Sequence, residues 1–185
     1  SNDKTHEILS KLEISKIRNE TNLGYGLSLN IGLKKAYELN MKFAITLDAD
    51  GQHDVNDVIK IKNLLFSGNT IAYGKRKFLP RFSEKIFSFY TSYVYNISDP
   101  LCGLKGYNLE DCRDLGILDK NNQIGAKTLL NCRRKKLKIQ QFEINHIIRA
   151  DKSRFGGSLN ANFKILKTLI SLVLNDLLRL FKINK

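Results

Sequence analysis

The sequence has 185 residues and a formal net charge of +13, with 42% hydrophobic and 26% charged residues. This composition excludes a disordered, collagen-like or disulfide-rich chain and predicts one globular domain with an appended element at most. The charge is uneven, because residues 121–185 hold 14 of the 31 Lys and Arg residues but only 3 of the 18 Asp and Glu residues. A basic last third indicates a face that meets phosphate, nucleic acid or an acidic membrane, with a solvated basic face as the alternative.

The cysteine pattern indicates a reducing compartment. Cys102, Cys112 and Cys132 are odd in number and form no CxxC pair, which argues against a disulfide framework and against a zinc site. The sequence also contains no signal-peptide pattern and no long uninterrupted apolar span.

The first 40 residues predict a helix over 3–14, a weak strand over 14–17, and a glycine-rich turn into a second helix. Asn22, Gly24 and Gly26 form this turn, and the helix from Leu27 has a buried side that extends to Leu39. Glycines before a helix N-terminus let a ligand approach exposed backbone N–H groups. The turn matches neither GxGxxG nor a P-loop, so a tight strand-to-helix turn is the simpler interpretation.

Two carboxylates follow the next apolar run. Residues 43–47 predict a buried strand that leads into Asp48 and Asp50, and Gly51 then lets the chain turn toward Gln52. Oxygen ligands at the carboxyl end of such a strand suit Mg or Mn. A strand followed by a polar helix cap is the competing interpretation.

The middle of the chain alternates helices and strands. A helix is expected over 55–66 and a strand over 70–73, followed by Gly74-Lys75-Arg76-Lys77. This alternation predicts a mostly parallel α/β sheet, with the basic residues on the same rim as the carboxylates. There they would neutralise a phosphate or lie in a solvated turn.

An aromatic-rich segment and a turn-rich loop come next. Residues 78–97 predict a helix from Ser83 onward whose aromatic side chains are core residues, or else form a lid or an acceptor surface. The loop over 99–107 begins with Asp99, a candidate base whose alternative role is an Asx turn before Pro100.

The last third predicts short helices over 109–115 and 124–137, a strand over 139–148, a polar loop over 149–160 and a long helix over 161–183. The second of these helices carries the basic run Arg133–Lys136. The last helix is amphipathic, so it lies on a membrane, on a partner, or on its own domain.

Five motifs, in order, make the chain resemble the family 2 glycosyltransferases with the GT-A fold. They are Asn22-Leu23-Gly24-Tyr25-Gly26, Asp48-Ala49-Asp50-Gly51-Gln52-His53, Gly74-Lys75-Arg76, Asp99-Pro100-Leu101-Cys102-Gly103 and Arg154-Phe155-Gly156-Gly157-Ser158. The subgroup that the chain resembles contains dolichol-phosphate mannose synthase and bacterial polyprenyl-phosphate glycosyltransferases.

This resemblance implies a GT-A domain over 1–158 and an amphipathic basic helix over 159–185. The family's opening strands, with P-x-x-N-E and D-D-G-S, have no counterpart here, and Ser1-Asn2-Asp3 resembles the end of D-D-G-S. We therefore expect an N-terminally truncated domain without its nucleotide-base side. Two further departures are Leu104-Lys105 in place of Phe-Arg and the missing acidic residue near 124–128.

The resemblance also implies an inverting transfer from a nucleotide-diphosphate sugar to a polyprenyl phosphate or a saccharide. Asp48, Asp50 and Gln52 would hold Mg or Mn, and Asp99 would be the base for a hydroxyl acceptor. The remaining substrate-binding candidates are Asn22, Gly24, Gly26, Arg76, Arg81, Arg154 and Ser158.

We expect a cytoplasmic enzyme at the inner face of an anionic membrane, with no nucleic acid as partner. The alternatives are an inactive glycosyltransferase fragment and a basic nucleic-acid-binding module. The second alternative has less support, because the aromatic residues at 78–95 and the basic residues at 127–154 are not interleaved.

Overall fold

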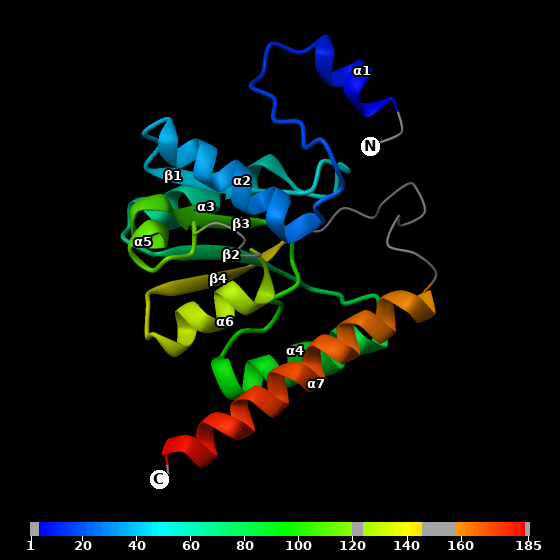
Figure 1. Ribbon diagram of the computed structural model, residues 1–185, viewed down its shortest axis with the longest axis vertical. Helices are drawn as coiled ribbons and strands as arrows, with labels where there is room; N and C mark the ends of the chain where they lie inside the picture. Colours follow the sequence, from blue (N-terminus) through cyan, green and yellow to red (C-terminus); the bar gives the residue numbers. More distant parts are fainter. Residues whose placement is uncertain (1–3, 120–123, 146–157, 184–185) are drawn as a thin grey trace.

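The computed structural model describes residues 4–119, 124–145 and 158–183 (Figure 1). Within these ranges the chain forms, in order, α1 (Thr5–Ser10), α2 (Tyr25–Glu38), β1 (Phe43–Thr46), α3 (Val55–Phe66), β2 (Ile71–Arg76), α4 (Phe82–Tyr95), β3 (Lys105–Asn108), α5 (Leu109–Asp114), α6 (Ala126–Arg134), β4 (Ile139–Ile144) and α7 (Ser158–Ile183). The α/β class predicted from the sequence, with a long C-terminal helix, is confirmed.

The strands form one sheet in the order β1-β3-β2-β4. β2 and β4 are parallel, and β3 is antiparallel to both β1 and β2, so three of the four strands run in the same direction. The carboxyl ends of β1, β2 and β4 therefore meet at one edge, as expected. β3 itself was not predicted, because Gly103 and Gly106 made its segment look like a loop.

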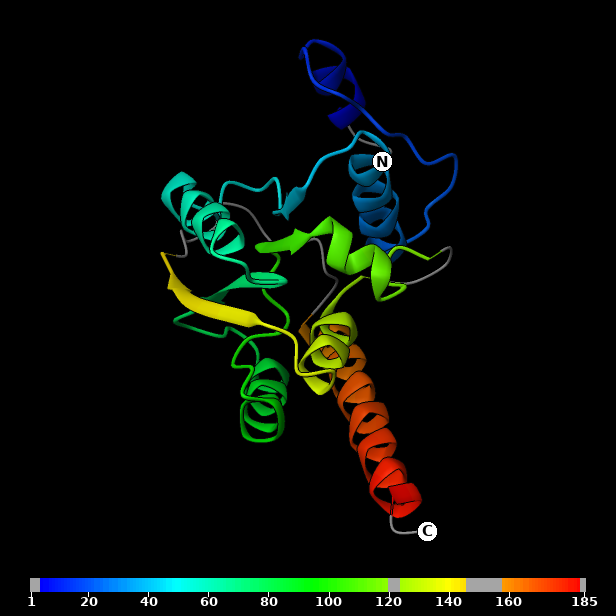
Figure 2. The ribbon, with the colours of Figure 1, turned by 90° about the vertical axis from the view of Figure 1, so that its left-hand side faces the viewer.

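One face of the sheet is covered by α3. Its buried Ile61 and Leu65 pack with Ala72 of β2 and with Leu104, which directly precedes β3. Figure 2 shows α3 on the opposite side of the sheet from α2, α5 and α6. The helix lies directly on β3, since a Cβ at Gly106 would lie 2.3 Å from Ile61 Cγ2. Gly106 is thus required for this close packing.

The larger core lies on the other face. Alternate strand residues such as Ile71, Tyr73 and Tyr107 point into it, as the two-residue period of a strand requires. Helices α2, α5 and α6 contribute Leu33, Cys112 and Leu130 to the same cluster, among others. Both faces of the sheet are therefore buried.

Helices α4 and α7 form a pair beside this core (Figure 1). The Ser83 N–H donates to Asn162 Oδ1 near the start of both helices (3.2 Å), and the Tyr90 hydroxyl donates to Asp176 Oδ2 further along (2.7 Å). The helices thus run in the same direction. Leu169 and Leu172 of α7 belong to the larger core, so the inner side of α7 packs on the domain.

Several predicted boundaries need correction. Residues 14–17 form no strand. Gly74, Lys75 and Arg76 belong to β2 rather than to a loop after it, because they pair with β4. α1 and α6 are shorter than predicted, and α7 begins at Ser158.

Candidate functional site

Asp48 and Asp50 lie in the turn between β1 and α3. β1 ends at Thr46, whose hydroxyl donates to the Gly103 carbonyl oxygen at 3.2 Å. The carboxylates therefore do not continue the strand. Asp50 Oδ1 accepts the Gln52 N–H at 3.3 Å, and Asp54 caps α3 through the Asn56 N–H at 2.7 Å. Asp54 is therefore the residue that caps α3. The interpretation of Asp48 as a helix cap has no support.

The Asp48 carboxylate packs against Gly103, which belongs to a loop distant in the sequence. A Cβ at Gly103 would lie 2.3 Å from Asp48 Oδ2, so any other residue there would displace the carboxylate. This contact brings together two of the sequence motifs, the Asp48–His53 turn and the Asp99–Gly103 loop.

The glycine-rich turn Asn22–Gly26 lies beside the Asp48–His53 turn and the Asp99–Gly103 loop. These three segments together are called the Asp48–Asp99 corner below. The Gly24 N–H donates to Asn22 Oδ1 at 3.0 Å, and α2 begins at the next residue, Tyr25. Partial burial raises the pKa of the Tyr25 phenol to about 12, and the charge of Asp48 acts in the same direction. The sequence alone gave no reason to single out Tyr25.

Arg76 and Asp99 form a buried, two-pronged ion pair. Asp99 accepts from Arg76 Nε (2.8 Å), Nη2 (3.0 Å) and the backbone N–H (3.1 Å), and its side chain is 3% exposed. Burial acts to lower the pKa of Arg76, but the hydrogen bonds that Arg76 donates to Asp99 and the charges of Asp99 and Glu84 outweigh it and raise that pKa. The guanidinium therefore stays charged.

Glu84 extends the pair into a network. Its carboxylate lies 3.1 Å from Arg76 Nη2 and 2.6 Å from Arg81 Nη1, and its side chain is 4% exposed. Three predicted site residues, Arg76, Arg81 and Asp99, are thus joined by an acid that sequence reasoning missed. The i, i+3 spacing of Arg81 and Glu84 was the available signal.

Lys105 is the second residue that was missed. It begins β3 opposite Thr46 and Tyr73 and is buried, and its ammonium donates to the Cys102 carbonyl oxygen. Burial lowers the pKa of Lys105, while the charges of Asp99 and Asp48 act to raise it. The sequence marked this position only as a departure from Phe-Arg.

The donor atoms at this corner suit a hard divalent cation. Asp48, Asp50 and Gln52 offer carboxylate and amide oxygens, and Mg²⁺ typically takes one or two protein carboxylates together with substrate phosphates. Within the described residues no group of three or more His, Cys, Asp or Glu side chains is placed to hold a metal ion. Carboxylate and amide oxygens of this kind suit a cation that is also bound by the phosphates of a substrate.

Two predicted site residues have a different status. Arg154 lies outside the described residues, and Ser158 is the first residue of α7.

Two carboxylates and a glycine-rich helix start thus lie at the carboxyl edge of an α/β sheet, where folds of this class bind their ligands. The family described as Glycosyl transferase family 2 matches residues 1–98. A second match is an uncharacterized protein of Methanocaldococcus jannaschii, which is 30% identical over 92% of this chain and 76% of its own length. The chain belongs to glycosyl transferase family 2, and its activity is glycosyl transfer.

A named relative comes from Methanococcus voltae. It is the UDP-N-acetylglucosamine–dolichyl-phosphate N-acetylglucosaminyltransferase, which is 26% identical over 96% of this chain and 84% of its own length. Enzymes of the family commonly use divalent cations.

Proposed function

We propose that this chain transfers a sugar from a nucleotide-diphosphate sugar to a polyprenyl phosphate, with inversion at the anomeric carbon. The name of the Methanococcus voltae relative, which includes a dolichyl-phosphate acceptor, supports this acceptor class. In the reaction the acceptor oxygen forms a bond to the anomeric carbon. The bond from that carbon to the nucleotide diphosphate breaks, and its electron pair leaves with the diphosphate.

Asp48, Asp50 and Gln52 are proposed to hold Mg²⁺ or Mn²⁺ against the donor diphosphate. The bound cation would offset the negative charge that develops on the leaving group. Asn22, Gly24 and Gly26 would let the donor approach the backbone at the start of α2. Arg81, and Arg154 and Ser158 from the late loop, remain proposed contacts to donor or acceptor phosphate.

The hydrogen bonds between Asp99 and Arg76 are the observation that favours a phosphate acceptor. Both Asp99 oxygens accept hydrogen bonds from Arg76 and the Asp99 side chain is 3% exposed, so a substrate hydroxyl has little access to the carboxylate. A polyprenyl phosphate oxygen is already anionic and needs no strong base. For a saccharide hydroxyl, Asp99 remains the candidate base, but it would first have to separate from Arg76.

A membrane surface is the proposed location of the reaction. Several large side chains of α4 and α7 are exposed: Phe89 (76%) and Tyr93 (88%) on α4, and Phe163 (68%), Ile170 (60%) and Leu174 (54%) on α7. The two acidic side chains of these helices, Glu84 and Asp176, contact arginines instead. Exposed apolar and basic side chains without acidic ones are typical of helices that lie on an anionic interface.

The prediction from the sequence assigned the membrane role to the basic last third and the C-terminal helix, and this proposal adds α4. Within residues 4–119, 124–145 and 158–183, no helix combines the length and apolar character that crossing a bilayer requires. The proposed association is therefore at the interface, through both α4 and α7.

The test of the transfer reaction compares the wild-type chain with Asp50→Ala, using radiolabelled UDP-N-acetylglucosamine and dolichyl phosphate with Mg²⁺ or Mn²⁺. We expect Asp50→Ala to lower the rate on the order of 10²-fold or more, with an unchanged unfolding midpoint. Equal rates in mutant and wild type, or undiminished rates in chelator, would contradict the metal assignment. If the wild-type chain transfers sugar to neither lipid nor saccharide acceptors, the alternative of an inactive glycosyltransferase fragment is favoured.

The membrane association is tested separately by co-sedimentation with phosphatidylglycerol vesicles. Phe89→Ser with Tyr93→Ser on α4, and Phe163→Ser with Leu174→Ser on α7, should each weaken binding by roughly tenfold or more, because each pair removes large apolar side chains. Val55→Ser, at another exposed apolar residue (72%), is the control. If only the α7 pair matters, α4 has no part in the association.

A further inference from the structure

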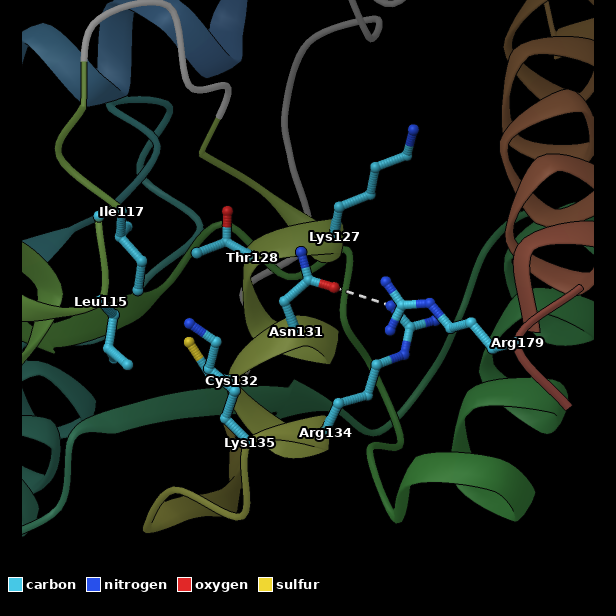
Figure 3. A pocket seen from close by; sticks show the side chains of 10 residues that line it. Leu115, Ile117, Lys127, Thr128, Asn131, Cys132, Arg134, Lys135 and Arg179 are labelled. Carbon is cyan, nitrogen blue, oxygen red and sulfur yellow. Dashed lines mark hydrogen bonds between the residues drawn. The ribbon is translucent and has the colours of Figure 1, made fainter. Parts of the chain in front are cut away.

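A cavity of about 680 Å³ lies between α6, α7 and the turn that follows α5 (Figure 3). Leu115, Ile117 and the buried Cys132 form its apolar part. It shares no described lining residue with the Asp48–Asp99 corner, so the transfer reaction proposed above does not use it. Its volume is in the range of pockets that hold small molecules.

The described lining of the cavity is basic. Lys127 and Arg134 from α6, Lys135 directly after α6, and Arg179 from α7 line it, and no described lining residue is acidic. Thr128 and Asn131 add a hydroxyl and an amide. These are the donors that bind phosphate groups.

Arg134 is held in place by its neighbours. It forms an ion pair with Asp176, donates to Asn131 Oδ1 at 2.7 Å, and lies over the Tyr95 ring at 5.0 Å from its centroid. Asp176 balances its charge. Arg134 thus lines the cavity with a fixed side chain whose positive charge is already paired with Asp176.

The other three cations are not balanced in this way. Lys127, Lys135 and Arg179 are exposed, and the described residues provide no salt bridge to any of them. Figure 3 shows the side chains of Arg134 and Arg179 extending toward each other from opposite sides of the cavity. Cations gathered around a hollow without acidic partners create a positive potential that an anion would relieve.

We propose that this cavity is a second anion site, which binds a phosphate-bearing ligand separate from the sugar donor. The ligand is a phosphate ester whose apolar part contacts Leu115 and Ile117. It is either the headgroup of an anionic lipid or a soluble phosphorylated molecule. The site accounts for basic residues of α6 that the transfer reaction does not need.

The test uses inorganic pyrophosphate as the soluble probe and calorimetry in the presence of chelator, without sugar nucleotide. Chelator keeps the proposed metal corner from contributing, so the outcome is independent of the transfer proposal. The cavity variant is Lys127→Gln/Lys135→Gln/Arg179→Gln, which leaves Arg134 and its ion pair intact. The matched control removes three exposed cations elsewhere, in Lys34→Gln/Lys42→Gln/Lys62→Gln.

We expect the cavity variant to bind pyrophosphate about tenfold or more weakly than wild type, and the control less than about twofold more weakly. Denaturant midpoints of both variants check that they fold. Equal weakening in cavity variant and control would show only a generally basic surface and would overturn the proposal.

Vesicles separate the two sources of phosphate. If the ligand is a lipid headgroup, the cavity variant also loses binding to phosphatidylglycerol vesicles, and pyrophosphate displaces the wild-type chain from them. If it is a soluble ester, pyrophosphate binding depends on the cavity while vesicle binding is equal in cavity variant and control. Absence of saturable binding to either probe would rule the site out.

Discussion

The position of the Asp48 carboxylate depends on a glycine 55 residues further along the chain, because Gly103 leaves the space that Oδ2 occupies. We predict that Gly103→Ala displaces the carboxylate, since a Cβ there would lie 2.3 Å from that oxygen. Transfer and Mn²⁺ affinity should both fall by on the order of tenfold or more. Electron paramagnetic resonance of Mn²⁺ measures the affinity directly.

Gly32→Ala is the matched control, because a Cβ at that helical position meets nothing within 4 Å. It should leave Mn²⁺ affinity unchanged and, as a Gly-to-Ala change within a helix, raise stability slightly. Wild-type Mn²⁺ affinity in Gly103→Ala would show that Asp48 is not a metal ligand.

The Arg76–Asp99 ion pair is predicted to stabilise the folded chain cooperatively, so that the contribution of each residue depends on the other. Arg76→Met leaves the buried Asp99 without its partner, and a loss of about 3–5 kcal/mol in the free energy of unfolding is expected. Asp99→Leu should cost a similar amount, because Arg76 then retains only Glu84. The double variant should cost clearly less than the sum, as measured by urea denaturation. Additive losses would mean that the two residues act independently.

At the scale of elements, helix α3 was more predictable from the sequence than the interior strand β3. The bounds of α3, 55–66, are as expected from its apolar period, and the structure adds Asp54 as its cap. β3 was hidden because its four residues, Lys105–Asn108, have a buried lysine and a glycine where a strand usually has large apolar side chains. Their pairing is set by β1 and β2, which a local pattern does not reveal.

The site shows the same division. The sequence identified Arg76, Arg81 and Asp99 as site residues, and the structure brings all three together. It did not identify their connection through Glu84, because a single acid in a helix gives no sign of burial. The aromatic residues of α4 were read as core residues, yet Phe89 and Tyr93 are exposed. Helical period alone does not tell which side of a helix faces inward.

The docking of α7 is predicted to weaken in acid. Partial burial acts to raise the pKa of Asp176, but hydrogen bonds from Tyr95, Tyr90 and Arg134 outweigh it and hold that pKa below its ordinary value of 3.8. The unfolded chain therefore takes up the proton first as pH falls. This contribution to stability is present above the ordinary value and is lost as pH falls through the lowered one.

Asp176→Asn isolates this effect. At neutral pH it should lower the free energy of unfolding by about 1–3 kcal/mol, because Arg134 loses its charged partner. As pH falls from the ordinary value of 3.8 through the lowered pKa of the folded chain, the difference between wild type and variant should shrink toward zero. Urea denaturation across that range measures it, and a constant difference would show that Asp176 has an ordinary pKa in the folded chain.

For the molecule as a whole, the three cysteines offer a way to separate local opening from global unfolding. Cys102, Cys112 and Cys132 are each at most 2% exposed. Burial raises their pKa values to about 11, 12 and 11. Because the thiolate is the reactive form, alkylation near neutral pH should require the chain to open.

The three cysteines are expected to become exposed through different motions, either local opening or global unfolding. Cys112 and Cys132 belong to the larger core, so their alkylation should follow global unfolding and accelerate steeply with urea. Cys102 lies in the Asp99–Gly103 loop beside the proposed donor corner, and it should react faster and with less dependence on urea. A nucleotide sugar with Mg²⁺ that binds at this corner should slow Cys102 by more than the other two. Mass spectrometry of iodoacetamide-labelled peptides gives all three rates in one sample. Equal slowing of all three would place the stabilising effect on the whole fold, and no slowing of any would contradict donor binding at this corner.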